Sequence, residues 1–381
     1  MSRKVYVVGT GIRRFGRFPD VSHPDFAWPV IREALLESGL DKNHIDVAYS
    51  SSVFGGMLLG QQVLGKLGIS GLPIINVENA CSSSAVGLRE AAARISSGQS
   101  ESALVFGVEM LSKLGGGPLP LNADDWEVSN GVSMPTIYAM RAQRYLYEHR
   151  LAPGDLSEVT VKARFHGSLN PLAQFQKSVT LEEVNASREV ASPLRLMHCC
   201  PTGDGAAAVV LVSEKLAQSL NIKNPVEILA TVLHSGLYEP GPSSMIKSHA
   251  SAKSAAEAYE AAGIGPEDVD VAELHDSFAI AELMYYEAFQ FCQPGEAIGL
   301  LRSGAASLGG RHVVNPSGGL LSRGHPVAAS GVAQICEITR QLQGRSGAHQ
   351  VAGAKVGLAH VTGGGIAGFE HGACAVTILK R

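Results

Sequence analysis

The feature that most constrains the fold of this 381-residue chain is an internal duplication. Residues 39–48 have a counterpart in residues 263–272, and each segment follows a helix-like stretch and runs on into an apolar strand. A second pair, residues 81–98 and 327–344, predicts a helix that ends at a glycine and precedes another strand. Two copies of an alternating strand–helix unit predict an α/β protein with parallel sheets covered by helices. In such sheets, functional side chains lie at the carboxyl ends of the strands.

Cys81 lies at the start of a predicted helix in the first copy. The apolar residues 72–77 before it predict a buried strand, and residues 88–97 after it predict a helix that ends at Gly98. Unpaired N–H groups and the dipole at a helix N-terminus favour a thiolate. For this segment alone, a buried and inert cysteine is the alternative interpretation.

Two histidines of the second copy occupy positions that should face Cys81. The His325–Pro326 step precedes the helix that corresponds to the Cys81 helix, and His275 follows the strand whose first-copy counterpart leads to Ser51. A pseudo-twofold arrangement brings these ends together at the centre. A cysteine that faces two histidines has the parts for nucleophilic catalysis: an attacking sulfur, a base and donors for an oxyanion.

Five short motifs in this chain resemble those of the thiolase superfamily, and the resemblance covers essentially the whole sequence. They are Asn-Ala-Cys-Ser-Ser-Ser at 79–84, His-Asp-Ser-Phe at 275–278, Asn-Pro-Ser-Gly-Gly at 315–319, Gly-His-Pro at 324–326 and Gly-Gly-Gly at 363–365. The chain is most similar to the sterol-carrier-protein type of thiolase and its archaeal and bacterial relatives, which include thiolases of anaerobic aromatic degradation. The resemblance implies the thiolase fold, with two pseudo-symmetric βαβαβαββ halves in five layers (αβαβα). The halves are expected at residues 1–222 and 223–381, with an inserted, substrate-covering loop region at about 111–189.

The resemblance also implies roles for individual residues. Cys81 would take the acyl group as a thioester, and His325 would draw the proton from Cys81 and face the thioester oxygen of the second substrate. His275 would help to form that oxyanion hole. The N–H of Cys81 and that of Gly363 or Gly364 would form the hole for the acyl-enzyme intermediate. Fixed donors aimed at a developing negative oxygen are what a tetrahedral intermediate requires.

One expected residue is missing. Thiolases carry a second cysteine as acid and base, and this chain has Ser277 in the block where its branch has that cysteine. A serine hydroxyl is a poor direct base near neutral pH. Three alternatives remain for proton transfer: Ser277 acting through water, His275, or His360. Cys374 lies in an apolar run and is expected in the core.

His166 falls in the region that covers the active site in thiolases, and we expect it to contact the substrate, with an ordinary loop histidine as the alternative. The Cys199–Cys200 pair lacks a spaced partner, so no metal site is expected. Coenzyme A is implied as a substrate, and no tightly bound cofactor is expected.

Composition excludes several classes of protein. The net charge of −4 provides no basic footprint for nucleic acid. No apolar run approaches the length of a membrane span, and the N-terminal residues predict a first strand rather than a signal peptide. Six cysteines without framework spacing indicate a reducing, cytoplasmic location.

Two functions therefore remain open. The first is a thiolase that cleaves a 3-oxoacyl-CoA with coenzyme A or runs the reverse condensation. The second is a thiolase-fold protein with changed chemistry: an aldolase-like lyase, acyl transfer to a non-CoA acceptor, or a non-catalytic binder of acyl-CoA or lipid. By resemblance we expect a homodimer, paired through the strand at residues 103–108. Bacterial relatives act with a small zinc-ribbon and OB-fold partner, and such a partner is expected here too.

Overall fold

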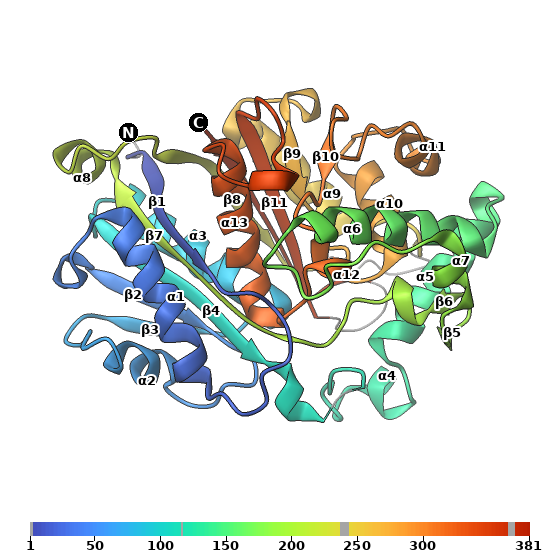
Figure 1. Cartoon of the computed structure of the whole chain (residues 1–381), viewed down its shortest axis with the longest axis horizontal. Helices are drawn as coiled ribbons and strands as arrows, with labels where there is room; N and C mark the ends of the chain where they lie inside the picture. Colours follow the sequence, from blue (N-terminus) through green and yellow to red (C-terminus); the bar gives the residue numbers. More distant parts are fainter. Residues whose placement is uncertain (1–2, 116, 237–243, 365–369) are drawn as a thin grey trace.

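The computed structural model describes residues 3–115, 117–236, 244–364 and 370–381, and within them the chain forms two similar α/β halves (Figure 1). The first half contains β1 (Val5–Ile12), α1 (His23–Ser38), β2 (Val47–Ser51), α2 (Leu59–Gly65), β3 (Ile74–Val77), α3 (Ser83–Ser96), β4 (Ser102–Met110), β7 (Asp204–Ser213) and α8 (Glu214–Ser219). The second contains β8 (Val226–His234), α9 (His249–Ala262), β9 (Val271–Glu273), α10 (Ala279–Ala288), α11 (Ala297–Arg302), β10 (Val313–Val314), α12 (Gly319–Ser322), α13 (Ser330–Leu342), β11 (Val356–Gly363) and β12 (Ala373–Lys380).

The strand order confirms the duplication. The order β3-β2-β4-β7-β1 in the first half matches β10-β9-β11-β12-β8 in the second. The halves join where β1 pairs with β8, through Tyr6 with Glu227 and Val7 with Val226. The expectation of parallel sheets was wrong, because β7 and β12 run antiparallel to the strands beside them. The ten strands form one sheet, and each half of it, called the first and the second sheet below, is therefore mixed.

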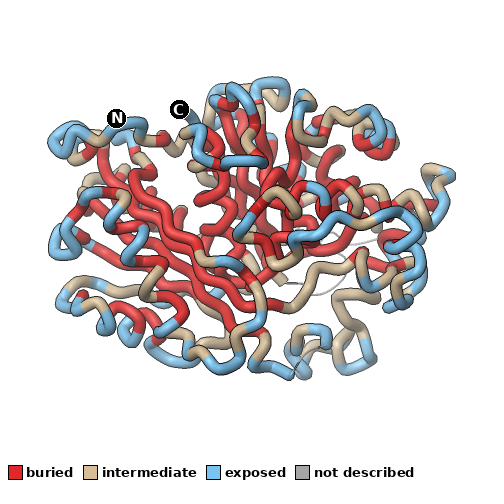
Figure 2. Tube along the Cα trace, in the orientation of Figure 1, coloured by how far each residue is buried: buried red, intermediate tan, exposed pale blue. Residues whose placement is uncertain are grey.

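The helices and sheets form the five expected layers. One core cluster joins α1 and α2 to one face of the first sheet, through residues such as Ile31, Val63 and Leu104. A second cluster joins the other face of that sheet to α3 and α13 and onward to the second sheet. The outer face of the second sheet packs against α9 and α10. Figure 2 shows the strands as the buried centre of the molecule, with exposed residues in the outer loops.

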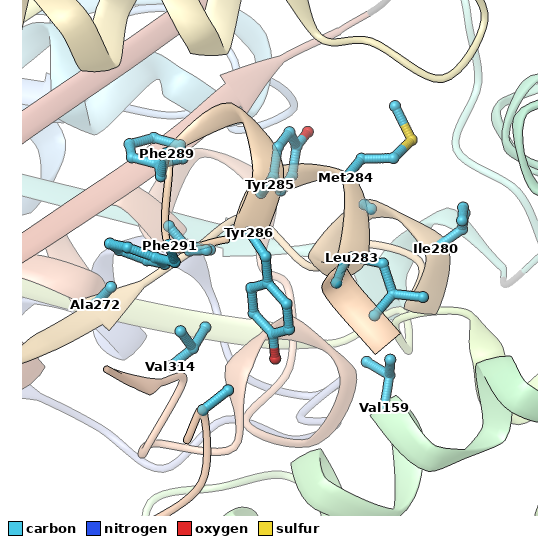
Figure 3. Close-up of a cluster of buried hydrophobic side chains, with 14 of the residues drawn as sticks. Val159, Ala272, Ile280, Leu283, Met284, Tyr285, Tyr286, Phe289, Phe291 and Val314 are labelled. Carbon is cyan, nitrogen blue, oxygen red and sulfur yellow. The ribbon is translucent and has the colours of Figure 1, made fainter. Parts of the chain in front are cut away.

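The region between β4 and β7 is mostly helical, in contrast to the loop region expected there. It holds α4 (Trp126–Ser129), α5 (Met134–His149), α6 (Ser157–Leu169), α7 (Leu181–Ala186), β5 (Glu189–Ala191) and β6 (Leu194–Arg195). Side chains of α5 and α6 share a core cluster with α10, where Tyr285 and Tyr286 of the helix and Phe289 just after it are buried (Figure 3). Packing against α10 thus fixes this insertion to the second half.

Two strand expectations were wrong. The strand at residues 103–108 is not an edge, because β4 lies between β2 and β7 and every residue of it is buried. The strand expected to be buried at residues 72–77 is instead β3, which lies at the end of the sheet and is at most half-buried. No helix of the described residues combines the length and the apolarity needed to cross a bilayer.

Candidate active site

Cys81 sits in a strained turn between β3 and α3. A short 3-10 helix at Ala80–Ser82 precedes α3, and Ala80 has a φ of 50°, which non-glycine residues rarely adopt. The Ser82 hydroxyl donates to the Asn79 carbonyl at 2.7 Å, and the Asn79 N–H donates to the Ser83 hydroxyl at 2.8 Å. These bonds over-determine the turn and hold the half-buried Cys81 in place.

His325 is in direct contact with Cys81. Its Nε2 lies 3.2 Å from the Cys81 sulfur, and its Nδ1 lies 2.8 Å from the Ser330 hydroxyl. Burial lowers the pKa of His325 to about 3 and raises that of the Cys81 thiol to about 12. The resting pair is therefore a neutral thiol and a neutral imidazole, with Nε2 placed to accept the thiol proton.

Two backbone N–H groups oppose the increase that burial causes in the Cys81 pKa. Hydrogen bonds from the N–H of Gly364 and from the residue's own N–H lower the thiol pKa, while the charges of Glu109 and Glu78 raise it further. At the final loop, the N–H group that lowers the Cys81 pKa is that of Gly364. Gly363 ends β11 and has a steric role, because a Cβ there would lie 2.5 Å from the Asn79 carbonyl oxygen.

His275 completes the cluster from the end of β9. Its ring meets that of His325 edge-on, with centroids 4.9 Å apart, and one ligating atom each from Cys81, His275 and His325 lie within 4.8 Å of one another. Burial and the neighbouring His325 hold the His275 pKa well below its usual range, so the ring is neutral. Its buried Nδ1 has no hydrogen-bond partner among the described residues. Three Cys and His atoms at this spacing can hold a metal ion, and equally they form a nucleophile, a base and an oxyanion donor.

The other predicted residues fall into different roles. His360 Nδ1 accepts the backbone N–H of His275 (3.4 Å), and His360 Nε2 lies 3.1 Å from the Ser251 hydroxyl. With both nitrogens occupied, His360 supports His275 rather than replacing the missing base. Ser277 is buried on the same turn as His275, to whose carbonyl its N–H donates at 2.9 Å. Cys374 is fully buried in the core, as expected.

His166 has a structural role in place of the expected substrate contact. The ring is fully buried in α6, its Nδ1 lies 2.9 Å from the Asn315 carbonyl, and Nε2 accepts the Leu308 N–H at 3.2 Å. Burial and the charge of Lys162 lower its pKa to about 3. Both ring nitrogens therefore serve to anchor the insertion to the second half.

Sequence reasoning missed Glu109, a buried carboxylate near Cys81. It accepts the N–H groups of Val53 (2.8 Å) and Phe54 (3.0 Å) and the Ser52 hydroxyl (3.0 Å), and so holds the loop after β2. Burial raises its pKa. The sequence could have indicated this buried carboxylate, because Glu109 is the single charged residue in the apolar run of β4.

Two family models and several known proteins match this chain along most of its length. The family model "Thiolase, N-terminal domain" matches residues 5–215, and "Thiolase C-terminal domain-like" matches residues 241–379. The chain is 42% identical to "Benzoylsuccinyl-CoA thiolase subunit BbsB" of Thauera aromatica, over 96% of each chain. It is 36% identical to human "Sterol carrier protein 2" over 99% of this chain and 72% of that protein. A solved structure described as "Ltp2-ChsH2(DUF35) aldolase" shares the fold, with a TM-score of 0.85, 24% identity, and coverage of 99% of this chain and 98% of that one.

Proposed function

The chain belongs to the thiolase family and is an acyltransferase that performs CoA-dependent cleavage or the reverse condensation, and we propose that it acts through an acyl thioester on Cys81. The observation that carries this proposal is the 3.2 Å contact between the Cys81 sulfur and His325 Nε2. An activated thiol serves bond formation and is not needed for binding alone.

The reaction follows from the positions of these groups. Cys81 attacks the 3-oxo carbonyl carbon as its proton passes to His325. The resulting oxyanion accepts hydrogen bonds from the N–H groups of Cys81 and Gly364. Collapse breaks the bond between the 2- and 3-carbons and releases the enolate of the shortened acyl-CoA, whose thioester oxygen faces His275 and His325. The enolate carbon then gains one proton, and the thiol of coenzyme A loses one as it attacks the acyl-Cys81 thioester, so these two transfers balance. His325 returns its proton to Cys81.

For the substrate, we propose a 3-oxoacyl-CoA with an aromatic or dicarboxylic acyl chain. The support is the 42% identity, over nearly all of both chains, to a thiolase named for benzoylsuccinyl-CoA. Cleavage of that compound by coenzyme A yields benzoyl-CoA and succinyl-CoA. The benzoyl group would then be the acyl group carried by Cys81.

Intact-mass measurement after incubation with a panel of acyl-CoAs tests this function. We expect a mass increase of one acyl group with benzoyl-CoA, larger than with acetyl-CoA at equal concentration. Addition of coenzyme A should discharge the label. Labelling by acetyl-CoA alone would refute the aromatic assignment, and no labelling by any acyl-CoA would refute the acyl-enzyme route.

We propose a homodimer that pairs through β3, in place of the buried β4. Among the described residues β3 has one strand neighbour, and its apolar side chains Ile74, Ile75 and Val77 are half-buried. An apolar strand with an open edge favours pairing with another chain. Sedimentation at micromolar concentration should give a dimer, and Ile75→Lys should shift it toward monomer; a native monomer would contradict the proposal.

We also propose a second partner and a location. The relative from Thauera aromatica is named as a subunit, which supports a partner chain. From the resemblance of the sequence, we propose that this partner is a small zinc-ribbon and OB-fold protein. All six cysteines are free thiols, which supports a cytoplasmic location. Copurification of a tagged chain with a small zinc-containing protein from its own cells would test the partner.

A further inference from the structure

We propose that Tyr138 is the proton reservoir for this reaction and that it acts on the substrate through Ser277, in place of the missing second cysteine. His371 is the positioning residue that holds the Tyr138 phenol and ties it to the Gly364 peptide. This inference rests on the proposed thiolase reaction and concerns its least explained step, which is the movement of protons at the substrate carbon and at the thiol of coenzyme A.

Tyr138 reaches the site from the insertion. It lies on α5 with 1% of its surface exposed, and its ring stacks on Phe278, the residue after Ser277, with centroids 4.3 Å apart. Burial raises the Tyr138 pKa, and the charge of Arg141 and the neighbouring Tyr285 and Ser277 hydroxyls act in the opposite direction. The negative charge of a Cys81 thiolate also acts on this phenol. Tyr138 is therefore a buried phenol beside Ser277 and within electrostatic reach of the nucleophile.

His371 fixes the direction of the hydrogen bonds. Its Nδ1 lies 2.9 Å from the Gly364 carbonyl oxygen, which can only accept, so Nδ1 carries the proton. Burial and Arg141 lower the His371 pKa to about 4, so the ring is neutral and Nε2 is an acceptor. Nε2 lies 3.0 Å from the Tyr138 hydroxyl and therefore receives its proton in a hydrogen bond. The phenol oxygen is left to accept from Ser277, and the Ser277 oxygen keeps its lone pairs for another donor.

His371 thus connects the Cys81 site with the proposed proton relay. Gly364, whose carbonyl binds His371, donates its N–H to the Cys81 sulfur. One imidazole therefore sets the position of an oxyanion donor and of the phenol. The Tyr285 hydroxyl lies farther from His371 Nε2, at 3.5 Å. The Tyr285 side chain leaves α10 on the opposite side from Tyr286 (Figure 3).

The proton transfers balance without any outside reagent. In cleavage, the enolate carbon takes the Ser277 hydroxyl proton, and Ser277 takes the proton of Tyr138, whose hydroxyl turns from His371 toward Ser277. The phenolate that remains accepts hydrogen bonds from Ser277 and Tyr285. When coenzyme A binds, its thiol proton passes to Ser277 as the Ser277 proton returns to Tyr138, and the new thiolate attacks the acyl-Cys81 thioester. A phenol is closer in pKa to a thiol than an alcohol is, so it suits this alternating role.

Two readouts separate this inference from the proposed function. The first is the extent of Cys81 acylation by benzoyl-CoA, measured by intact mass. The second is exchange of the α-protons of acetyl-CoA and succinyl-CoA into deuterated water, followed by NMR. Tyr138→Phe should leave the acylation endpoint unchanged and lower the exchange rate about 100-fold or more, which is the usual contribution of an acid–base group. Combining it with Ser277→Ala should add little, since both residues act on one path.

Two further variants test the roles of the individual groups. Tyr145→Phe is the matched control, because Tyr145 is another buried tyrosine of α5 whose hydroxyl instead binds Glu287 at 2.6 Å. It should exchange at the native rate. His371→Gln retains an acceptor for the phenol, so exchange should fall less than in His371→Ala.

The outcomes are distinguishable. Exchange within threefold of native in Tyr138→Phe, or an equal loss in Tyr145→Phe, would overturn the role of Tyr138. Equal losses in His371→Gln and His371→Ala would overturn it too, because they would make the imidazole the base. A native protein that is acylated but exchanges neither probe contradicts the relay alone. A native protein that is never acylated contradicts the proposed function.

Discussion

Replacing Gly363 by alanine should slow acylation of Cys81 sharply, because this position sets the distance between the last strand and the nucleophile turn. An added Cβ would lie 2.5 Å from the Asn79 carbonyl oxygen and 2.6 Å from the Ser82 hydroxyl, where ordinary contacts begin near 3.4 Å. The nearer contact alone requires a shift of about 0.9 Å, and backbone atoms on both sides resist it. Overpacking of this kind costs about 1–3 kcal/mol of stability.

The effect on rate should exceed the effect on stability. A misplacement of about 1 Å can cost on the order of 100-fold in rate, and the turn that must move carries Cys81. We therefore expect Gly363→Ala to acylate about 100-fold more slowly than native, measured by quenched intact mass with benzoyl-CoA. Gly299→Ala is the matched control, because a Cβ on Gly299 of α11 meets no atom within 4 Å. Native acylation rates and unchanged denaturant stability in Gly363→Ala would refute the steric reasoning.

Three other predictions concern the acid–base chemistry. Ser277→Cys should increase α-proton exchange of acetyl-CoA, because a thiol near the operating pH is a better proton shuttle than an alcohol; exchange that stays at or below the native rate would contradict this. Alkylation of Cys81 by iodoacetamide should be slower at pH 7 than that of an ordinary thiol and should rise continuously to pH 10, because burial raises the Cys81 pKa to about 12. Since the pKa of His325 is lowered to about 3, its protonation should produce no loss of acylation between pH 5 and 7, and a loss centred near pH 6.5 would contradict a buried, neutral imidazole.

The clustering of Cys81, His275 and His325 was predictable because the duplication carries geometric information. Cys81, His325 and His275 lie at matching ends of repeated elements, and the structure brings the three together. The sequence could not show that β4 is a central strand. Its neighbour β7 follows it only after an insertion of about ninety residues, so the pairing of the two strands is not evident from their positions in the chain. Apolar composition alone does not distinguish a central strand from an exposed edge.

The residues that sequence reasoning missed depend on tertiary packing. Tyr138 comes from the insertion and reaches Ser277 because α5 packs against α10. His371 follows the final glycine-rich segment and acts on that phenol across more than two hundred residues. His166 is the opposite case: it lies in the region where a substrate contact was expected, but both of its ring nitrogens contact backbone groups. Residue type and sequence region indicated which histidines could belong to the site. Only their hydrogen-bond partners in the folded chain distinguished those that face the site from those with a structural role.

The most direct measurement of the central claim is the site of acylation. Native protein should be incubated with benzoyl-CoA, digested, and analysed by peptide mass spectrometry beside the Cys81→Ala variant. We predict one acyl group, on the peptide that contains Cys81, and none on the variant, which should retain the native fold by circular dichroism. Equal label on the folded Cys81→Ala variant, or a label on another residue of the native protein, would contradict the assignment of Cys81 as the nucleophile.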